Sequence, residues 1–151
     1  MGSEYGLELS TDLKPKQVLC LLADRLELKW VDGKSLRGPA LWIDSREVTG
    51  IRCDIIKEGF HFRPDVLVVF RLNPNSDEYE EGNRLMLRAT MALLEQSRDG
   101  VLLFNGEHIV LQRIGGQLML NADYGGWTDG FCLENEVWLS HETRSLPSPL
   151  L

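Results

Sequence analysis

His61 and Asp65 are the residues whose types and spacing come nearest to acid–base chemistry. A histidine titrates near neutral pH, and a neighbouring carboxylate can orient its ring, so such a pair can transfer protons. The pair falls in a stretch with loop character, because Pro64 cannot donate to a strand ladder and restricts Arg63. A turn-stabilising or surface role is the simpler interpretation, and an acid–base pair is the alternative.

No motif for a nucleophile or a phosphate site accompanies this pair. The sequence has no GxSxG, Walker or GxGxxG pattern, and Gly115-Gly116 lies between two strand-like runs where a phosphate loop would need a following helix. Cys20, Cys53 and Cys132 are odd in number and widely spaced, which indicates buried thiols and not disulfides or metal ligands. We therefore expect a protein that is not an enzyme and that needs no cofactor or metal.

A glycine-rich loop with aromatic residues, from Tyr124 to Gly130, is the remaining candidate for a binding site. Tyrosine and tryptophan are frequent at interface hot spots because they bury a large area at a small entropy cost. We predict Tyr124, Trp127 and Asp129 as the binding residues. The alternative is that Trp127 folds back as a lid over one end of the core.

The stretch from Val101 to Asn121 is the clearest structural signal in the chain. Its two turns, Asn105-Gly106 and Gly115-Gly116, separate three short apolar runs and predict a three-stranded meander. With two-residue turns, alternate residues sort into two faces. The predicted core face carries Leu102, Phe104, Ile109, Leu111, Leu118 and Leu120, and the mixed face carries Val101, Leu103, His108, Val110, Gln112 and Met119. The mixed face needs a cover from another element or serves as a partner-binding surface.

The other elements follow from hydrophobic periodicity and turn residues. In order, we predict a strand at Tyr5–Ser10, a helix from Pro15 that ends before Trp30, a turn at Asp32–Lys34, strands at Ala40–Asp44, Val48–Ile56 and Val66–Leu72, a helix at Asp77–Ser97, the meander, and a last strand at Val137–Leu139. This order predicts a single α+β domain over residues 1–151, a two-layer sandwich of two main helices on a mostly antiparallel sheet. A ferredoxin-like core with added strands is one topology that fits.

Composition limits the classes of partner. The chain has 151 residues, 43% of them hydrophobic, and a net charge of −7. An acidic surface disfavours nucleic acid and anionic membranes but can attract a basic protein. No apolar run approaches the ~20 residues of a membrane span, and the start MGSEYGLELS lacks the features of a signal peptide. We expect a cytoplasmic location.

Three phrases of the sequence together resemble a bacterial family. They are YGLELS followed by a helix that begins with proline, GFHFRPDVLVVFRLN, and LLEQSRDGVLLFNGEHIVLQRIGGQLMLN followed by Trp127. From about Tyr5 to Trp138 the chain resembles the Sit-type immunity proteins, which protect myxobacterial and related cells from a swarming-inhibition toxin passed between siblings. The resemblance implies a small cytosolic protein that binds and blocks a toxin without a cofactor. With the acidic charge, we expect that toxin to be basic.

Two other classes of function stay open at this point. One is a small-molecule-binding or enzymatic α+β domain, which would use His61, Asp65 and the glycine-rich loop in one polar pocket. The other is an oligomeric structural protein that pairs through the mixed face of the meander.

Overall fold

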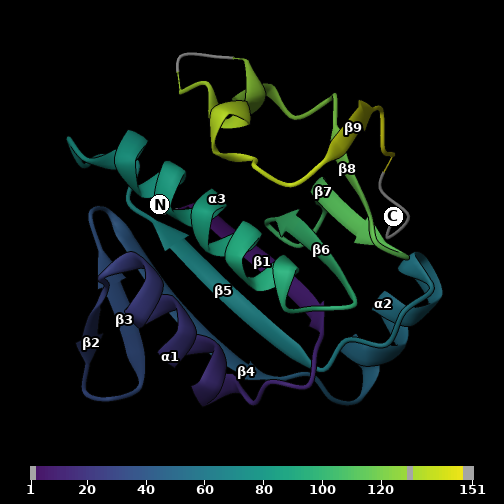
Figure 1. The fold of residues 1–151 in the computed structure, drawn as a ribbon, viewed down its shortest axis with the longest axis horizontal. Helices are drawn as coiled ribbons and strands as arrows, with labels where there is room; N and C mark the ends of the chain where they lie inside the picture. The colour runs from purple at the N-terminus through teal and green to yellow at the C-terminus, as the bar shows by residue number, and fades with distance from the viewer. Residues whose placement is uncertain (1–2, 129–130, 148–151) are drawn as a thin grey trace.

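A curved nine-stranded sheet organises the protein (Figure 1). The computed structural model describes residues 3–128 and 131–147. The strands are β1 (Ser3–Ser10), β2 (Lys29–Val31), β3 (Ser35–Gly38), β4 (Leu41–Glu47), β5 (Val66–Leu72), β6 (Asp99–Phe104), β7 (His108–Ile114), β8 (Gln117–Asn121) and β9 (His141–Arg144). The helices are α1 (Pro15–Leu26), α2 (Ile51–Phe60) and α3 (Tyr79–Glu95), with the short 3₁₀ turns η1 (Gly125–Trp127) and η2 (Leu133–Glu136).

The sheet confirms the predicted α+β class. Its strand order is β2-β3-β4-β5-β1-β6-β7-β8-β9, and every pair is antiparallel except β8 with β9. At the centre, β1-α1-β4-β5-α3-β6 follows the βαββαβ pattern of a ferredoxin-like fold. The hairpin β2–β3 and helix α2 are inserted into this core, and β7 to β9 extend the sheet beyond it.

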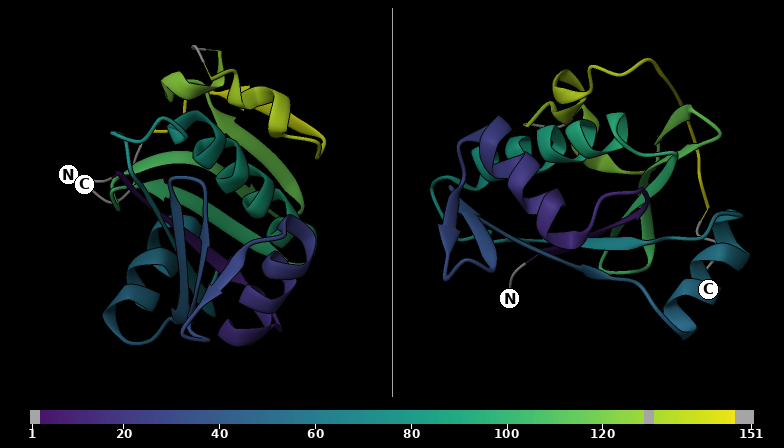
Figure 2. Two further views of the ribbon diagram at one scale, coloured as in Figure 1. Left: turned by 90° about the vertical axis from the view of Figure 1, so that its left-hand side faces the viewer. Right: turned by 60° about the horizontal axis from the view of Figure 1, so that its bottom comes forward.

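Helices α1 and α3 cover one face of the sheet and form the main core with it (Figure 2). The sheet bends around α3, and the segment that contains η2 lies against the far side of this helix (Figures 1 and 2). As a result, 11 of the 17 residues of α3 are buried. The polar strip of α3 holds that segment in place, because Arg84 donates to the Phe131 carbonyl at 3.3 Å and Arg88 donates to Glu136 at 2.7 Å. Among the described residues, no helix has the length and hydrophobicity needed to cross a bilayer.

Helix α2 corrects the prediction of a strand at Val48–Ile56. Residues 51–60 are helical, and the buried side chains Cys53, Ile56 and Phe60 recur three and four residues apart, the helical period. An apolar run this short fits both a strand, with a period of two residues, and a helix, with a period of about 3.6. The prediction used the period of two, which was wrong. The last strand is also displaced: residues 137–139, where it was predicted, follow η2 and form no strand, and His141–Arg144 pairs with β8 instead.

Helix α2 is the cover that the mixed face of the meander requires. Ile56, Phe60 and Phe62 pack against Val101 and Leu103 on the face of the sheet opposite α1 and α3. The two-layer arrangement therefore gains a partial third layer, visible below the sheet in the right-hand view of Figure 2. The proposed pairing of copies through this face loses its basis, because these strand residues are buried within the chain.

The predicted register is right at the second turn of the meander and wrong at the first. Ile114 pairs with Gln117, as a two-residue turn at Gly115-Gly116 requires. The first turn has three residues, so Phe104 pairs with His108. A bulge after Leu102 then shifts the pairing by one more residue, so that Leu102 pairs with Leu111 and the predicted alternation of faces returns. Two residues change faces: Ile109 packs under α2, and Val110 joins the main core. A shift of one residue reverses the direction of every side chain in between.

The thiols also differ from expectation. Cys53 is buried under α2, whereas Cys20 is exposed on α1 and Cys132 is exposed before η2. The buried side chains of α1 are Val18, Leu19 and Leu22, and the apolar run around Cys20 is wider than the stripe that the sheet covers.

An ion pair between a buried carboxylate and a partly exposed arginine connects the middle of the sheet to α2. Glu8 of β1 is fully buried, and its Oε2 accepts a hydrogen bond from Arg52 Nε at 2.6 Å. The other carboxylate oxygen, Oε1, has no hydrogen-bond partner within the described chain. Burial raises the pKa of Glu8 and outweighs the opposing attraction of Arg52.

The raised pKa of Glu8 predicts a pH dependence with a definite sign. Its contribution to stability is fully present below the ordinary carboxyl pKa of 4.5 and is lost as pH rises through the higher value of the folded state. The free energy of unfolding of the wild type relative to Glu8→Gln should therefore increase when pH falls from 7.5 to 5.0. Urea denaturation at both pH values measures this. Glu4→Gln is the control, because it makes the same change on the same strand at a half-exposed side chain. If the difference in free energy of unfolding between the wild type and Glu8→Gln did not change with pH, changed as much for Glu4→Gln, or fell at the lower pH, the raised pKa of Glu8 would be contradicted.

Gly82 sets how closely α3 approaches the β3–β4 turn. A Cβ added there would lie 2.6 Å from the Pro39 carbonyl oxygen and 3.0 Å from Leu72 Cδ2. Gly82→Ala should lower the free energy of unfolding by about 1–3 kcal/mol, although alanine is the better helix former. Thermal or urea unfolding tests this, with the exposed neighbour change Glu81→Ala as the control. A Gly82→Ala protein more stable than the wild type would show that α3 is free to shift.

Candidate functional site

The predicted binding loop lies against the start of β1. Tyr124 precedes η1, and its hydroxyl is 2.8 Å from the hydroxyl of Tyr5. Trp127 is buried, and its indole Nε1 donates to the Asn121 carbonyl at 2.8 Å. The two rings of the loop meet edge to face, with centroids 5.3 Å apart. Trp127 thus packs into the core beneath Tyr124, and Asp129 falls outside the described residues.

A cavity of about 220 Å³ opens beside Tyr124. Its lining comes from four parts of the chain: Tyr5, Tyr79, Asn83, Tyr124, Gly126, Phe131 and Leu133. Three of these residues are tyrosines, and Tyr79 also packs edge to face on Phe131. Binding pockets for drug-sized molecules usually measure about 300–1,000 Å³. This cavity is smaller than those, and its size suits a single side chain of a partner.

The tyrosine hydroxyls serve as hydrogen-bonding groups at neutral pH. Burial raises the pKa of Tyr5, and the neighbouring hydroxyl of Tyr124 adds to that effect. Burial also raises the pKa of Tyr124, although its hydrogen bond with Tyr5 acts in the opposite direction. Both side chains therefore stay protonated, and because one hydroxyl donates to the other, the proton of the second is left to donate to a carbonyl or carboxylate. Neither can serve as a base.

Gly126 determines where the Tyr124 ring lies. A Cβ on Gly126 would come within 2.7 Å of Cε2 and 3.0 Å of Cζ of that ring. The ring is the far end of a flexible side chain, so a larger residue at this position would move the ring and leave the backbone in place. The loop thus needs a small residue at Gly126 to hold Tyr124 against Tyr5.

His61 and Asp65 do not form the alternative acid–base pair. His61 caps the end of α2 with a φ of 64°. Asp65 Oδ2 accepts from the Thr11 backbone at 2.9 Å and lies 3.6 Å from Arg98. No hydrogen bond or ion pair joins His61 to Asp65 in the described chain. Asp65 lies beyond the end of β1, whereas Tyr124 contacts the beginning of that strand. His61 and Asp65 therefore do not share a pocket with the glycine-rich loop.

A second and larger hollow lies on the other side of the start of α3. This groove has a volume of about 910 Å³ and is lined by the end of α1, the β3–β4 turn, Trp42, residues 71–78 and Leu85. Both hollows therefore border the first two turns of α3, which contribute Tyr79 and Asn83 to the cavity and Leu85 to the groove. Within the described chain, no group of three His, Cys, Asp or Glu side chains is placed to hold a metal ion.

Sequence reasoning identified one wall of the tyrosine cavity and missed the others. Tyr5 was placed on a strand and Tyr79 within a helix start, without any signal that they would meet Tyr124. Their approach depends on the C-terminal segment folding back across α3, a long-range contact that no local pattern encodes. The groove was missed for a related reason, since it lies where four separate segments end.

Comparison with known proteins gives a family and no closer relative. No curated protein and no solved structure matches this chain. Residues 3–131 match the SitI3-like family, and this range includes the ferredoxin-like core, the meander, Tyr124 and Trp127. The match is consistent with the resemblance to Sit-type immunity proteins found in the sequence. The chain belongs to the SitI3-like family.

Proposed function

We propose that this protein is a non-enzymatic immunity protein that binds a cognate bacterial toxin in the cytoplasm and blocks it by direct contact. Membership of the SitI3-like family over residues 3–131 is the observation that carries the proposal. The net charge of −7 favours a basic toxin, because opposite charge speeds and orients association.

The tyrosine cavity is the contact that we propose for the toxin. Its open volume of about 220 Å³ is bordered by aromatic rings and by hydroxyls that can donate hydrogen bonds. Interface hot spots are commonly anchors seated in such desolvated pockets. Tyr124 would touch the toxin directly, and Trp127 would hold Tyr124 from below. Asp129, two positions after Trp127 in the sequence, stays in the proposal as an acidic residue that suits a basic partner.

Co-expression with the toxin encoded beside this gene tests the function. Cells that carry both genes should survive, and the two proteins should purify together at a defined ratio. A strain with the toxin alone should stop growing, which controls for an inactive toxin. Survival without any complex would contradict blocking by direct binding, and death in the presence of folded protein would contradict the immunity function.

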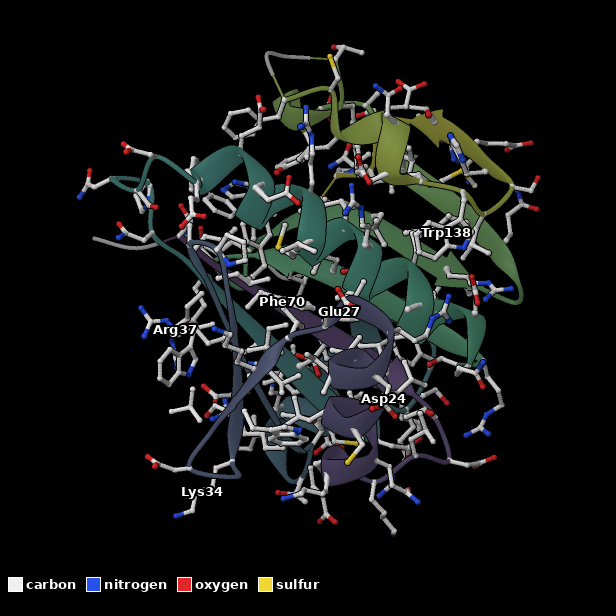
Figure 3. The ribbon with its side chains drawn as sticks, turned by 60° about the vertical axis from the view of Figure 1, so that its left-hand side comes forward. Asp24, Glu27, Lys34, Arg37, Phe70 and Trp138 are labelled. Carbon is white, nitrogen blue, oxygen red and sulfur yellow. The ribbon has the colours of Figure 1, made fainter. Side chains whose placement is uncertain are left out.

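Tyr124→Ala tests the proposed contact. Removing the ring should weaken toxin binding by about 2 kcal/mol or more, roughly 30-fold, because the cavity loses one of its walls and the toxin side chain loses the contacts with it. Calorimetric titration measures the affinity. Gly126→Ala, which displaces the same ring, should also weaken binding. Trp138→Ala is the control, because this ring (labelled in Figure 3) is half exposed, does not line the cavity and donates to Glu95 at the other end of α3. Equal losses for Tyr124 and Trp138 would contradict the site.

A further inference from the structure

A row of four side chains crosses the outer face of the sheet next to the groove. Lys29 of β2 lies directly opposite Arg37 of β3, Arg37 lies opposite Trp42 of β4, and Trp42 lies opposite Arg71 of β5. Directly opposite residues share a face of the sheet, so the row alternates with the buried residues Leu36, Ile43 and Phe70 of the core. All four side chains of the row line the groove.

The charges in this row are balanced at one end and unbalanced at the other. Arg71 pairs with Glu4 at 3.2 Å and with Asp44 at 3.0 Å. Lys29 and Arg37, in contrast, have no carboxylate oxygen within 4.0 Å in the described part of the chain. Like charges directly opposite each other destabilise a strand pair. The hairpin therefore carries an exposed like-charged pair that no carboxylate of the described chain meets in an ion pair, in a protein with an excess of acidic residues.

The groove offers apolar surface next to these two cations. Trp42 is half buried, and Leu26, Leu28 and Pro39 also contribute to the lining. Two residues that border the groove, Glu27 and Ala40, have a φ of 54°, a left-handed conformation that side chains rarely adopt. Glu27 and Glu78 also line the groove, so the cationic part of its wall is the strand row that contains Lys29 and Arg37. An open trough with cations in that row and apolar surface beside them suits an extended peptide with both carboxylates and apolar side chains.

We infer that this groove docks an acidic segment of the partner protein, whose carboxylates pair with Lys29 and Arg37 while its apolar side chains lie on Trp42. The inference rests on the proposed function and adds a second contact, on the opposite side of the start of α3 from the tyrosine cavity. A protein segment fits better than nucleic acid, because two cations in a chain of net charge −7 cannot neutralise a run of phosphates. A basic toxin can still present a locally acidic segment to this groove.

Single charge reversals in the row give a test that separates binding from folding. Lys29→Glu and Arg37→Glu each turn the like-charged pair into an opposite pair, so both variants should unfold at the same temperature as the wild type or higher. The same variants should lose affinity for acidic ligands. Lys34→Glu is the matched control, because it makes the same charge change in the turn of the same hairpin (Figure 3).

The probe is a fluorescent 12-residue peptide of alternating glutamate and leucine with one tryptophan, and its partner control has lysine in place of glutamate. We expect the acidic peptide to bind the wild type and Lys34→Glu equally in low salt, and at least ten-fold more weakly to Lys29→Glu and Arg37→Glu. Equal binding of both peptides, unchanged affinity in both reversals, or tighter binding of an oligothymidine of similar length would overturn the inference.

The toxin experiment then tells the two proposals apart. If the toxin binds and is blocked equally by the wild type and by both charge reversals, the groove contact is wrong and the immunity function stands. If the toxin is neither bound nor blocked while the acidic peptide still depends on Lys29 and Arg37, the immunity function is wrong and the groove remains a peptide site.

Discussion

The structure depends on one constraint: strands β5 and β6, on either side of β1, are apolar on both faces, so both faces of the sheet must be covered there. Leu7 and Phe70 point toward α1 and α3, while Leu67, Val69 and Val101 point the other way, toward α2. An open antiparallel sheet can leave one face to water, but this one cannot. The insertion between β4 and β5 meets that need, and the Glu8–Arg52 pair holds it between two apolar patches. The remaining strands extend the sheet on both sides of this centre, which is covered on both faces.

The same requirement explains where the two hollows lie. The sheet bends around α3, and the C-terminal segment closes over the exposed side of the helix through Arg84 and Arg88. These contacts lie along the middle of α3, and the start of the helix is where Gly82 brings its backbone against the β3–β4 turn. The tyrosine cavity and the groove open on either side of that point. One end of the molecule thus combines aromatic rings, hydrogen-bond donors and uncompensated cations.

Local sequence patterns correctly predicted the elements that have one clear period or turn composition. The strand at residues 66–72 is apolar throughout and is central in the sheet, and the helix predicted at 77–97 is present at 79–95. The turn at Gly115-Gly116 has positive φ at both residues, as its composition requires. The α+β class and the ferredoxin-like core follow from such segments in their order along the chain.

The errors occur where a short segment fits two periods or where a long-range contact decides. Residues 48–56 alternate well enough for a strand, but residues 51–56 begin a helix whose residues Ile56 and Phe60 pack against the apolar face at Val101. The register error at Ile109 and Val110 comes from a three-residue turn followed by a bulge, two features that sequence alone does not distinguish from a two-residue turn. The loop at Tyr124 that we propose as a binding site was chosen from its composition, and its place beside Tyr5 and Tyr79 depends on the C-terminal segment folding back over α3.

The most direct test of the account is amide hydrogen exchange of this protein with and without the toxin encoded beside its gene. The account predicts slower exchange in the complex at residues 76–85, at residues 122–128 and in the hairpin at residues 29–37, with little change in α2 or β9. Protection confined to the outer surface of α2 or to β9, with residues 76–85 unchanged, would contradict it.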